Sequence, residues 1–219
     1  MDKWRLLFSK TGRAVYISHL DLMRTMTRAF LRAGLRLKYS EGFNPHPNIS
    51  IALPLSVGCE SNCEIMDFKL AEERKPDEIL ELLSWQLPEG IEAIDVYEAE
   101  LKVKELKWLR ISGRLEFDDR DTNTMTEALD GFFSRESIVI QKKTKRGLSE
   151  SDIKCAIKEL DFEESCDAVW MKGVISAQEP TLNPELLIEA LRQLAPEIAP
   201  DFAKFKRIEV FKENMEVFR

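Results

Sequence analysis

The hydrophobic pattern of the first hundred residues switches repeatedly between the period of a strand and that of a helix. Apolar runs or apolar–polar alternation predict strands, and apolar side chains three or four residues apart predict helices with one buried face. Strands are expected at residues 3–9, 48–57, 63–70 and 91–99, and helices at residues 18–33 and 76–87. Pro54 interrupts the second strand, which favours an edge or a bulge. The β-α-β-β-α-β order is typical of a ferredoxin-like unit.

The same order of elements returns from Leu101 onward. Strands are expected at residues 107–117, 137–141, 168–177 and 205–212, and helices at residues 122–133 and 183–194. Residues 149–160 fit either a helix or an irregular segment. The sequence therefore predicts an α+β fold of two tandem ferredoxin-like (β-α-β-β-α-β) units, residues 1–100 and 101–219, with a basic insertion near residues 142–160 in the second.

The helix expected at residues 18–33 carries signals for its start, its end and its buried face. Ser18 can accept a hydrogen bond from the N–H of Asp21, whose carboxylate can reach back to the cap, so the pair forms a capping box. Gly34 is expected to end the helix. One stripe should face the core: Leu22, Met26, Ala29, Phe30 and Ala33.

Another face of the same helix carries Arg24, Arg28 and Arg32, four residues apart. Asp21 can pair only with the first of them, and a row of guanidinium groups favours an anion lying across it. His19 falls in the first turn, where the helix dipole favours a bound anion or a neutral imidazole. The alternative is a solvated helix face with no ligand.

The segment from Tyr39 to Pro47 reads Tyr-Ser-Glu-Gly-Phe-Asn-Pro-His-Pro. Its two prolines, glycine and asparagine prevent both helix and strand, which leaves large side chains on a rigid loop. Such a loop is a candidate binding surface. The alternative is an elaborate turn in which Phe43 fills the core and His46 has only a structural role.

Charge is distributed unevenly along the chain. The net charge is −7, but residues 1–50 hold nine Lys and Arg against three acids, a balance of +6, so the remainder carries −13. A local basic patch can attract a polyanion whatever the total charge. A second basic run, Lys142-Lys143-Thr144-Lys145-Arg146-Gly147, is expected to be a loop between strands. Its alternative is a solvated hairpin.

Other features limit the location and the chemistry. No apolar run is long enough to span a bilayer, so a cytoplasmic protein without membrane contact is expected. Two cysteines have the spacing C-x3-C but lack further ligands, so a metal site is not expected. Buried thiols are the expectation for the cysteines, Cys59, Cys63, Cys155 and Cys166.

Motifs for nucleotide-phosphate binding and for serine or zinc hydrolases do not occur, and no cofactor is expected. Only His19 and His46 are histidines, and general acid–base chemistry near neutral pH would depend on them. Together with Tyr39 they are the candidate catalytic residues. A metal-independent RNA cleavage site could combine a histidine, a tyrosine and the arginine row.

Two motifs in the first seventy residues carry a family resemblance. They run from Ser18 to Ala29, with Ser-His-Leu-Asp-Leu-Met-Arg at the start, and from Tyr39 to Gly58, including the nine-residue loop. In them the chain resembles the radical-SAM-associated (radical-SAM-linked) bacterial domain of unknown function. The resemblance implies an accessory role beside a radical SAM protein, because this chain lacks the C-x3-C-x2-C motif that holds such an enzyme's cluster. It implies no catalytic residue.

The sequence supports one leading hypothesis and two alternatives. The leading one is a non-catalytic module that binds RNA, with tRNA and rRNA as the candidates, and acts with a radical SAM enzyme. The alternatives are a metal-independent endoribonuclease or RNA-modifying enzyme that uses His19 or His46, and a protein–protein adaptor. The candidate RNA-binding residues are Arg24, Arg28, Arg32, Tyr39, Ser40, Phe43, Asn44, His46, Lys142, Lys143, Lys145 and Arg146.

Overall fold

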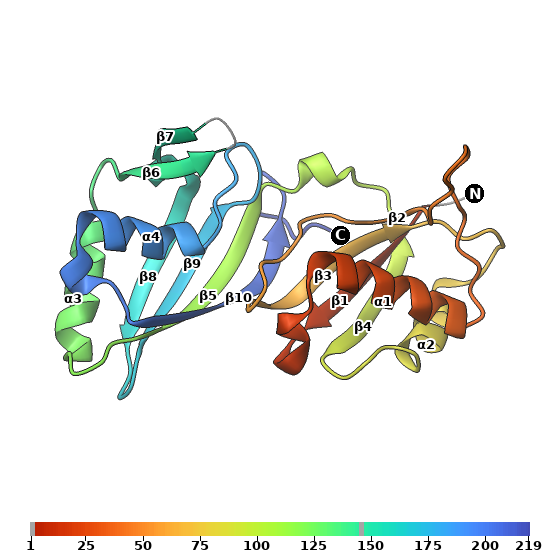
Figure 1. Cartoon of the computed structure of the whole chain (residues 1–219), viewed down its shortest axis with the longest axis horizontal. Helices are drawn as coiled ribbons and strands as arrows, with labels where there is room; N and C mark the ends of the chain where they lie inside the picture. The colour runs from red at the N-terminus through yellow and green to blue at the C-terminus, as the bar shows by residue number, and fades with distance from the viewer. Residues whose placement is uncertain (1–2, 145–146) are drawn as a thin grey trace. The chain divides into compact units, whose positions relative to one another are not determined.

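The computed structural model describes residues 3–144 and 147–219 and shows a mixed α/β fold. The chain divides into two compact units (Figure 1). Unit 1 runs to Val103 and includes Arg219, and unit 2 spans Lys104–Phe218. Each unit combines two α-helices with antiparallel strands.

Unit 1 is a three-stranded sheet in the order β4-β1-β3, with a short β2 added beside β3, and all its pairs are antiparallel. Figure 1 shows both helices on one side of these strands. In chain order the elements are β1 (Trp4–Lys10), the 3-10 helix η1 (Gly12–Tyr16), α1 (His19–Arg32), β2 (Ile49–Ile51), β3 (Glu60–Phe68), α2 (Pro76–Ser84) and β4 (Ile91–Glu98).

Helix α1 forms as the sequence predicts. The Ser18 hydroxyl accepts from the N–H of Asp21 over 3.2 Å, as an N-cap does, and donates to the Asp21 carboxylate over 2.8 Å. The return bond of the predicted capping box therefore involves the hydroxyl of Ser18. Gly34 follows the helix with a φ of +72°, a conformation that favours glycine. Four residues of the expected stripe are buried, and Ala33 is half-buried: Leu22, Met26, Ala29 and Phe30.

The core of unit 1 lies between this stripe, the buried face of α2 and one face of the sheet. Its centre is an aromatic pair, with the rings of Phe30 and Phe68 4.8 Å apart. The second strand is shorter than predicted, Ile49–Ile51 instead of residues 48–57. The chain turns away before Pro54, which cannot donate to a sheet ladder.

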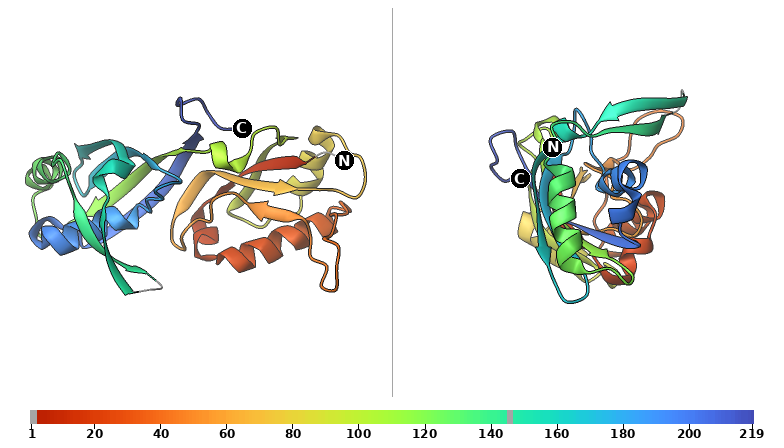
Figure 2. Two further views of the ribbon diagram at one scale, coloured as in Figure 1. Left: turned by 90° about the horizontal axis from the view of Figure 1, so that it is seen from above. Right: turned by 90° about the vertical axis from the view of Figure 1, so that its left-hand side faces the viewer.

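Unit 2 is a four-stranded antiparallel sheet in the order β10-β5-β9-β8, beside a separate two-stranded hairpin of β6 and β7. The views in Figure 2 show the hairpin extending away from the larger sheet. In chain order the elements are η2 (Val103–Glu105), β5 (Trp108–Glu116), α3 (Thr122–Phe133), β6 (Val139–Thr144), β7 (Gly147–Asp152), η3 (Lys154–Ala156), β8 (Ile157–Glu164), β9 (Val169–Ser176), α4 (Glu185–Leu194), η4 (Pro196–Ile198) and β10 (Phe202–Phe211).

The structure corrects the prediction for residues 149–160, which are strand β7, a 3-10 turn and the start of β8. Apolar residues at Ile153, Ala156, Ile157 and Leu160 imitate helical spacing. The 3-10 turn produces this spacing, because it buries Ile153 and Ala156 before the chain extends again. The basic run is not a plain loop either, since Lys142 and Lys143 belong to strand β6.

The Asp152 carboxylate joins the two ends of the hairpin. It accepts from the N–H of Ile138 at 3.0 Å, the N–H of Lys154 at 2.9 Å and the Ser137 hydroxyl at 2.8 Å. These hydrogen bonds, first of all that from the N–H of Ile138, hold the pKa of Asp152 below its ordinary value. A carboxyl with a lowered folded-state pKa stabilises the fold above its ordinary pKa and loses that contribution as pH falls through the folded-state value.

We therefore expect Asp152→Asn to be less stable than wild type at pH 7. The difference should shrink as pH falls below the carboxyl's ordinary pKa of 3.8, because the wild-type side chain then becomes protonated too. Urea unfolding of both proteins at several pH values measures this difference. A gap that stays constant down to pH 2 would contradict the assignment.

Two of the four cysteines differ from expectation. Cys59 and Cys63 are buried, whereas Cys155 and Cys166 are exposed. Cys155 lies in the 3-10 turn after β7 and Cys166 lies in the turn between β8 and β9, where side chains face outward. Their apolar sequence neighbours Ile153, Ala156 and Ala168 are buried, but the cysteines themselves are not.

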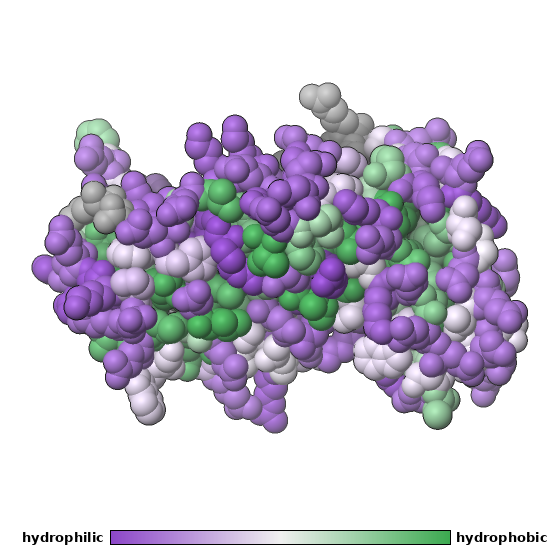
Figure 3. Space-filling model, turned by 180° about the vertical axis from the view of Figure 1, so that it is seen from behind, coloured by the Kyte–Doolittle hydropathy of each residue, from purple (hydrophilic) through white to green (hydrophobic). Residues whose placement is uncertain are grey.

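Within residues 3–144 and 147–219, no helix has the length and apolar character needed to cross a membrane. Figure 3 shows the molecule from behind, and hydrophilic side chains predominate there, with hydrophobic ones between them.

Candidate nucleic-acid interface

The Tyr39–Pro47 loop has a fixed base and an exposed tip. Tyr39 and Pro47 form an isolated antiparallel bridge, and the N–H of Ser40 donates to the carbonyl of His46 over 2.8 Å. Between them, every residue from Glu41 to Pro45 is exposed. Gly42 has a φ of +120°, which a residue with a side chain would adopt only under strain. Backbone contacts therefore hold the base of the loop, and its tip projects into solvent.

Ser40 and His46 also join through their side chains. The Ser40 hydroxyl accepts from the backbone N–H of His46 over 3.1 Å and lies 2.9 Å from Nδ1 of the ring. Nδ1 also lies 3.4 Å from the carbonyl oxygen of Asn44, which can only accept. In the tautomer with its hydrogen on Nδ1, the ring donates to these oxygens and Nε2 carries a free lone pair. The sequence placed both residues in one loop but did not predict their contact.

Phe43 stands fully exposed at the tip of the loop. The alternative in which it fills the core is therefore wrong. Tyr39, at the base, is half exposed. Aromatic rings held open to solvent beside a rigid backbone are available for stacking on flat ligands.

A hollow of about 280 Å³ adjoins the loop at His46. It lies on the side of the sheet opposite the helices, because Phe68 faces the helical core and its neighbours Asp67 and Lys69 alternate to the other side. The lining is mainly polar: Lys3, His46, Pro47, Asn48, Ile49, Ser50, Asp67, Phe68 and Lys69.

The hollow has a positive balance of charge. Asp67 is its one acid, and two cations share that carboxylate, with Arg5 Nε at 2.7 Å from Oδ1 and Lys3 Nζ at 2.5 Å from Oδ2. Lys69 adds a further charge, and Lys38 lies beside it because its N–H donates to the Lys69 carbonyl over 2.8 Å. The surplus positive charge makes this surface suitable for a phosphate backbone.

The Arg5–Asp67 pair beneath the hollow is fully enclosed. Arg5 has no exposed surface, and it binds Asp67 through two nitrogens and donates to the carbonyl of Leu101 over 3.0 Å. Nearby, burial raises the pKa of the Tyr97 hydroxyl to about 12. A buried ion pair therefore lies beneath the hollow, while Lys3 and Lys69 line it.

The arginine row of α1 lies away from this hollow. It faces outward from the helix layer, which covers the opposite side of the sheet. Arg24 pairs with Asp21 over 2.9 Å, as expected, and Arg32 donates to the carbonyl of Gln86 over 2.5 Å. The hydrogen bond from Ser18, followed by that from Arg24, lowers the pKa of Asp21. In the described part of the chain, Arg28 has no polar partner.

The two histidines are not brought together. His19 is the first residue of α1, whereas the loop with His46 lies beyond the other end of that helix (Figure 1). A helix of 14 residues is about 21 Å long. A single catalytic site containing both rings is therefore not formed in this structure.

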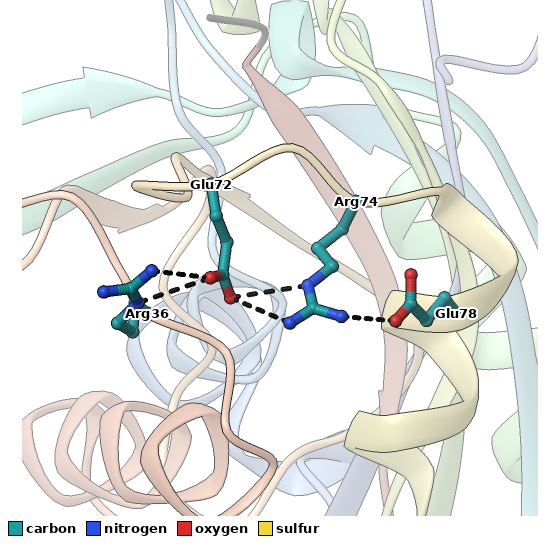
Figure 4. A network of polar contacts seen from close by, with 4 residues as sticks. All are labelled: Arg36, Glu72, Arg74 and Glu78. Carbon is teal, nitrogen blue, oxygen red and sulfur yellow. Dashed lines mark hydrogen bonds and ion pairs between the residues drawn. The ribbon is translucent and has the colours of Figure 1, made fainter.

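A chain of ion pairs that the sequence did not predict runs beside α2 (Figure 4). Glu72 binds Arg36 at 2.9 Å and Arg74 at 3.3 Å, and Arg74 binds Glu78 at 2.5 Å. The hydrogen bond from Arg36 is the main cause of a lowered pKa at Glu72, and Glu78 is the main cause of a raised pKa at Arg74. Both arginines are thus occupied by carboxylates and are poor candidates for binding an anion.

The second basic run is only partly described. Lys142 lies half-buried in β6, while Lys145, Arg146 and the side chain of Lys143 lie outside the described residues. The side-chain amide of Gln193, on α4, accepts from the N–H of Gln141 at 2.8 Å and donates to its carbonyl at 3.0 Å. This paired contact fixes the base of the hairpin to α4.

Fold and site together define a two-unit mixed α/β protein with a basic surface beside an aromatic-tipped loop. The chain belongs to the family described as an uncharacterized protein conserved in bacteria (DUF2344), which matches residues 3–184. No curated protein matches the sequence.

Among solved structures, the chain is similar to one in the crystal structure of a Cbf5-Nop10-Gar1 complex, with a TM-score of 0.51 and 10% identity. The match covers 96% of this chain and 50% of that one, so this chain spans about half the other's length. At this identity the likeness concerns the fold alone.

Two further matches have TM-scores too low to support any argument. One is an unknown protein from Galdieria sulphuraria, with a TM-score of 0.27, 10% identity and coverage of 94% of this chain and 98% of that one. The other is Thermus thermophilus Cse3 bound to an RNA representing a pre-cleavage complex. Its TM-score is 0.21 and its identity 16%, and the match covers 94% of this chain and 99% of that one.

Proposed function

We propose that unit 1 is a non-catalytic module that binds single-stranded or loop RNA, such as tRNA or rRNA, at the Tyr39–Pro47 loop and its adjoining hollow. One observation carries the proposal: a fully exposed Phe43 stands at the tip of a rigid loop whose base opens into a hollow rimmed by lysines. RNA loops and single strands are recognised by stacking on aromatic rings together with cationic contacts to phosphate.

Each part of the surface has a defined task in this proposal. Phe43 and Tyr39 stack on unpaired bases, and Lys3, Lys38 and Lys69 bind the phosphates. The polar groups of the loop and the hollow can meet base edges or 2′-hydroxyls, which distinguishes RNA from DNA: Ser40, Asn44, His46, Asn48 and Ser50. The basic run from Lys142 to Arg146 gives unit 2 a second set of contacts.

The tandem ferredoxin-like architecture belongs to the same proposal. In unit 1 the central strands are β1 and β3, and in unit 2 they are β5 and β9. If the β6–β7 hairpin is set aside as an insertion, each unit has four strands, which can be numbered 1 to 4 along the chain. Their order across the sheet is then 4-1-3-2 in both units, which is the order that β-α-β-β-α-β connectivity produces. Two such units offer two separate surfaces to one folded RNA.

The resemblance to radical-SAM-associated domains supports a partner role. We propose that the module presents its RNA to a radical SAM protein that supplies the iron–sulfur cluster. Cys59 and Cys63 are buried thiols and make poor ligands for an exchangeable cluster.

A second candidate function is favoured by the contact between Ser40 and His46. A histidine oriented through Nδ1 could use Nε2 as a general base toward an RNA 2′-hydroxyl as that oxygen attacks the neighbouring phosphorus. The bond from phosphorus to the 5′-oxygen of the next nucleotide then breaks, a 2′,3′-cyclic phosphate forms, and the leaving 5′-oxygen takes a proton from water. This version predicts that His46→Ala abolishes cleavage of a bound RNA but leaves its affinity nearly unchanged. The binding module predicts no cleavage by either protein.

The RNA proposal is tested by fluorescence anisotropy with a labelled single-stranded 12-mer and with tRNA. We expect Phe43→Ala to weaken binding about tenfold, since one base–aromatic stack contributes about 1–3 kcal/mol. Lys3→Ala/Lys69→Ala should weaken binding and reduce the magnitude of the salt slope by about 1.4, because each phosphate contact of a single strand contributes about 0.7.

The matched controls are Phe202→Ala and Arg192→Ala, which alter an exposed aromatic and an exposed cation in unit 2. Neither control should change affinity by more than about twofold. If RNA affinity changes neither with salt concentration nor in any of the four variants, this surface is excluded as an RNA site and the protein adaptor is favoured.

A further inference from the structure

The outer faces of the two helices of unit 1 carry opposite charges at the same spacing. On α1, Arg24 and Arg28 are exposed one turn apart, and on α2, Asp77 and Glu81 are exposed one turn apart. Side chains four residues apart lie on one face of a helix. The helix layer therefore has a basic half and an acidic half.

Large apolar side chains are exposed on the same two faces. Leu20 and Leu31 lie on the arginine face of α1, with 66% and 78% of their surfaces exposed, and Trp85 directly follows α2 with 82% exposed. The hydrogen bond from Arg32 to the Gln86 carbonyl keeps Trp85 close to the C-terminal end of α1. Both helices bury their inner faces in one core, so their outer faces belong to one layer.

Among the described residues, these helix charges make no ion pair between α1 and α2 of unit 1. In the described part of the chain Arg28, Asp77 and Glu81 have no ion-pair partner, and Arg24 binds only the exposed Asp21. No ion pair joins the arginines of α1 to the acids of α2 among the described residues. Both halves of the layer are thus available to a charged partner.

We infer that this helix layer docks a second copy of the chain, with α1 of each copy lying against α2 of the other. A twofold axis between the two helices brings the basic half of one layer onto the acidic half of its mate, so each ion pair forms twice. Tryptophan, leucine and arginine then occupy the centre of the contact, where burial contributes most. RNA fits this layer poorly, because the carboxylates of α2 repel phosphate and leucines do not stack on bases.

Sedimentation velocity over a concentration series tests the inference. We expect wild type to shift toward a dimer as concentration rises, and to shift back at 1 M salt as screening weakens the ion pairs. Arg28→Glu and Glu81→Arg should each weaken self-association at least tenfold. A mixture of the two variants should recover a dimer, because both contacts of the mixed dimer then pair opposite charges, one as in wild type and one with the signs exchanged.

Glu127→Arg and Arg192→Glu are the matched controls, since both reverse an exposed helical charge in unit 2, and both should dimerise like wild type. Wild type that remains monomeric at the highest concentration would overturn the inference. A mixture of Arg28→Glu and Glu81→Arg that remains monomeric would overturn it as well. Arg28 lies away from the hollow, so the RNA proposal predicts no effect of Arg28→Glu on RNA affinity. If this variant loses RNA affinity while its sedimenting mass stays that of wild type, the inference is overturned and the helix face is assigned to RNA.

Discussion

Replacing Asp67 with alanine is expected to destabilise the protein by about 3–5 kcal/mol, the cost of removing one partner from a buried ion pair. Arg5 has no exposed surface, and two of its nitrogens bind the Asp67 carboxylate at 2.7 and 3.2 Å. The alanine variant removes the carboxylate that neutralises this enclosed guanidinium charge. Urea unfolding followed by circular dichroism measures the loss.

A double variant separates the cost of the orphaned charge from the value of the pair. Arg5→Met/Asp67→Leu removes both charges at similar volume, so it should be more stable than Asp67→Ala alone. If the double variant is the less stable of the two, the ion pair itself provides the stabilisation. The hollow would then depend on that pair for its shape.

Replacing Phe30 with alanine should cost about 3–5 kcal/mol as well, through lost burial and the cavity left behind. Its ring is fully buried and packs 4.8 Å from Phe68, between α1 and the sheet. Thermal and urea unfolding of unit 1 would show the loss directly.

Phe43→Ala is the natural control, because it deletes the same atoms from a fully exposed position. Its stability should stay within about 0.5 kcal/mol of wild type. A similar loss from both variants would mean that the loop packs on the protein in solution, and Phe43 could not then be free for stacking.

Local signals predicted the helices well. Residues 18–33 contain a cap, an apolar stripe and a terminal glycine, and α1 follows them within a residue at either end. Residues 122–133 became α3 with the same bounds. The failure at 149–160 arose because a single 3-10 turn copies helical spacing for a few residues, and the pairing of β8 with β9 decides the outcome. Strand pairing is not encoded in a short window.

The candidate site was predictable only where it is local. The rigid loop and its aromatic residues could be identified from prolines and glycine, but the hollow needs Lys3 and Lys69, which are far apart in the sequence and meet through the pairing of β1 with β3. The sequence also grouped the arginine row with the loop. Phe68 faces the helical core while its neighbours face the other way, so the hollow lies on the side of the sheet away from α1. The sequence does not show which side of the strand α1 covers.

The position of β1 inside its sheet, between β4 and β3, affects folding during synthesis. Both neighbours of β1 come much later in the chain, and its first residue, Trp4, lies opposite Phe68 in β3 and Glu98 in β4. On the ribosome, the apolar run Leu6-Leu7-Phe8 emerges early and has no partner strand until most of unit 1 has been synthesised. Helix α1 can form during that wait because its signals are local, whereas closure of the sheet depends on distant contacts and is slow. Until β3 and β4 have been synthesised, β1 is therefore open to chaperone binding and to aggregation.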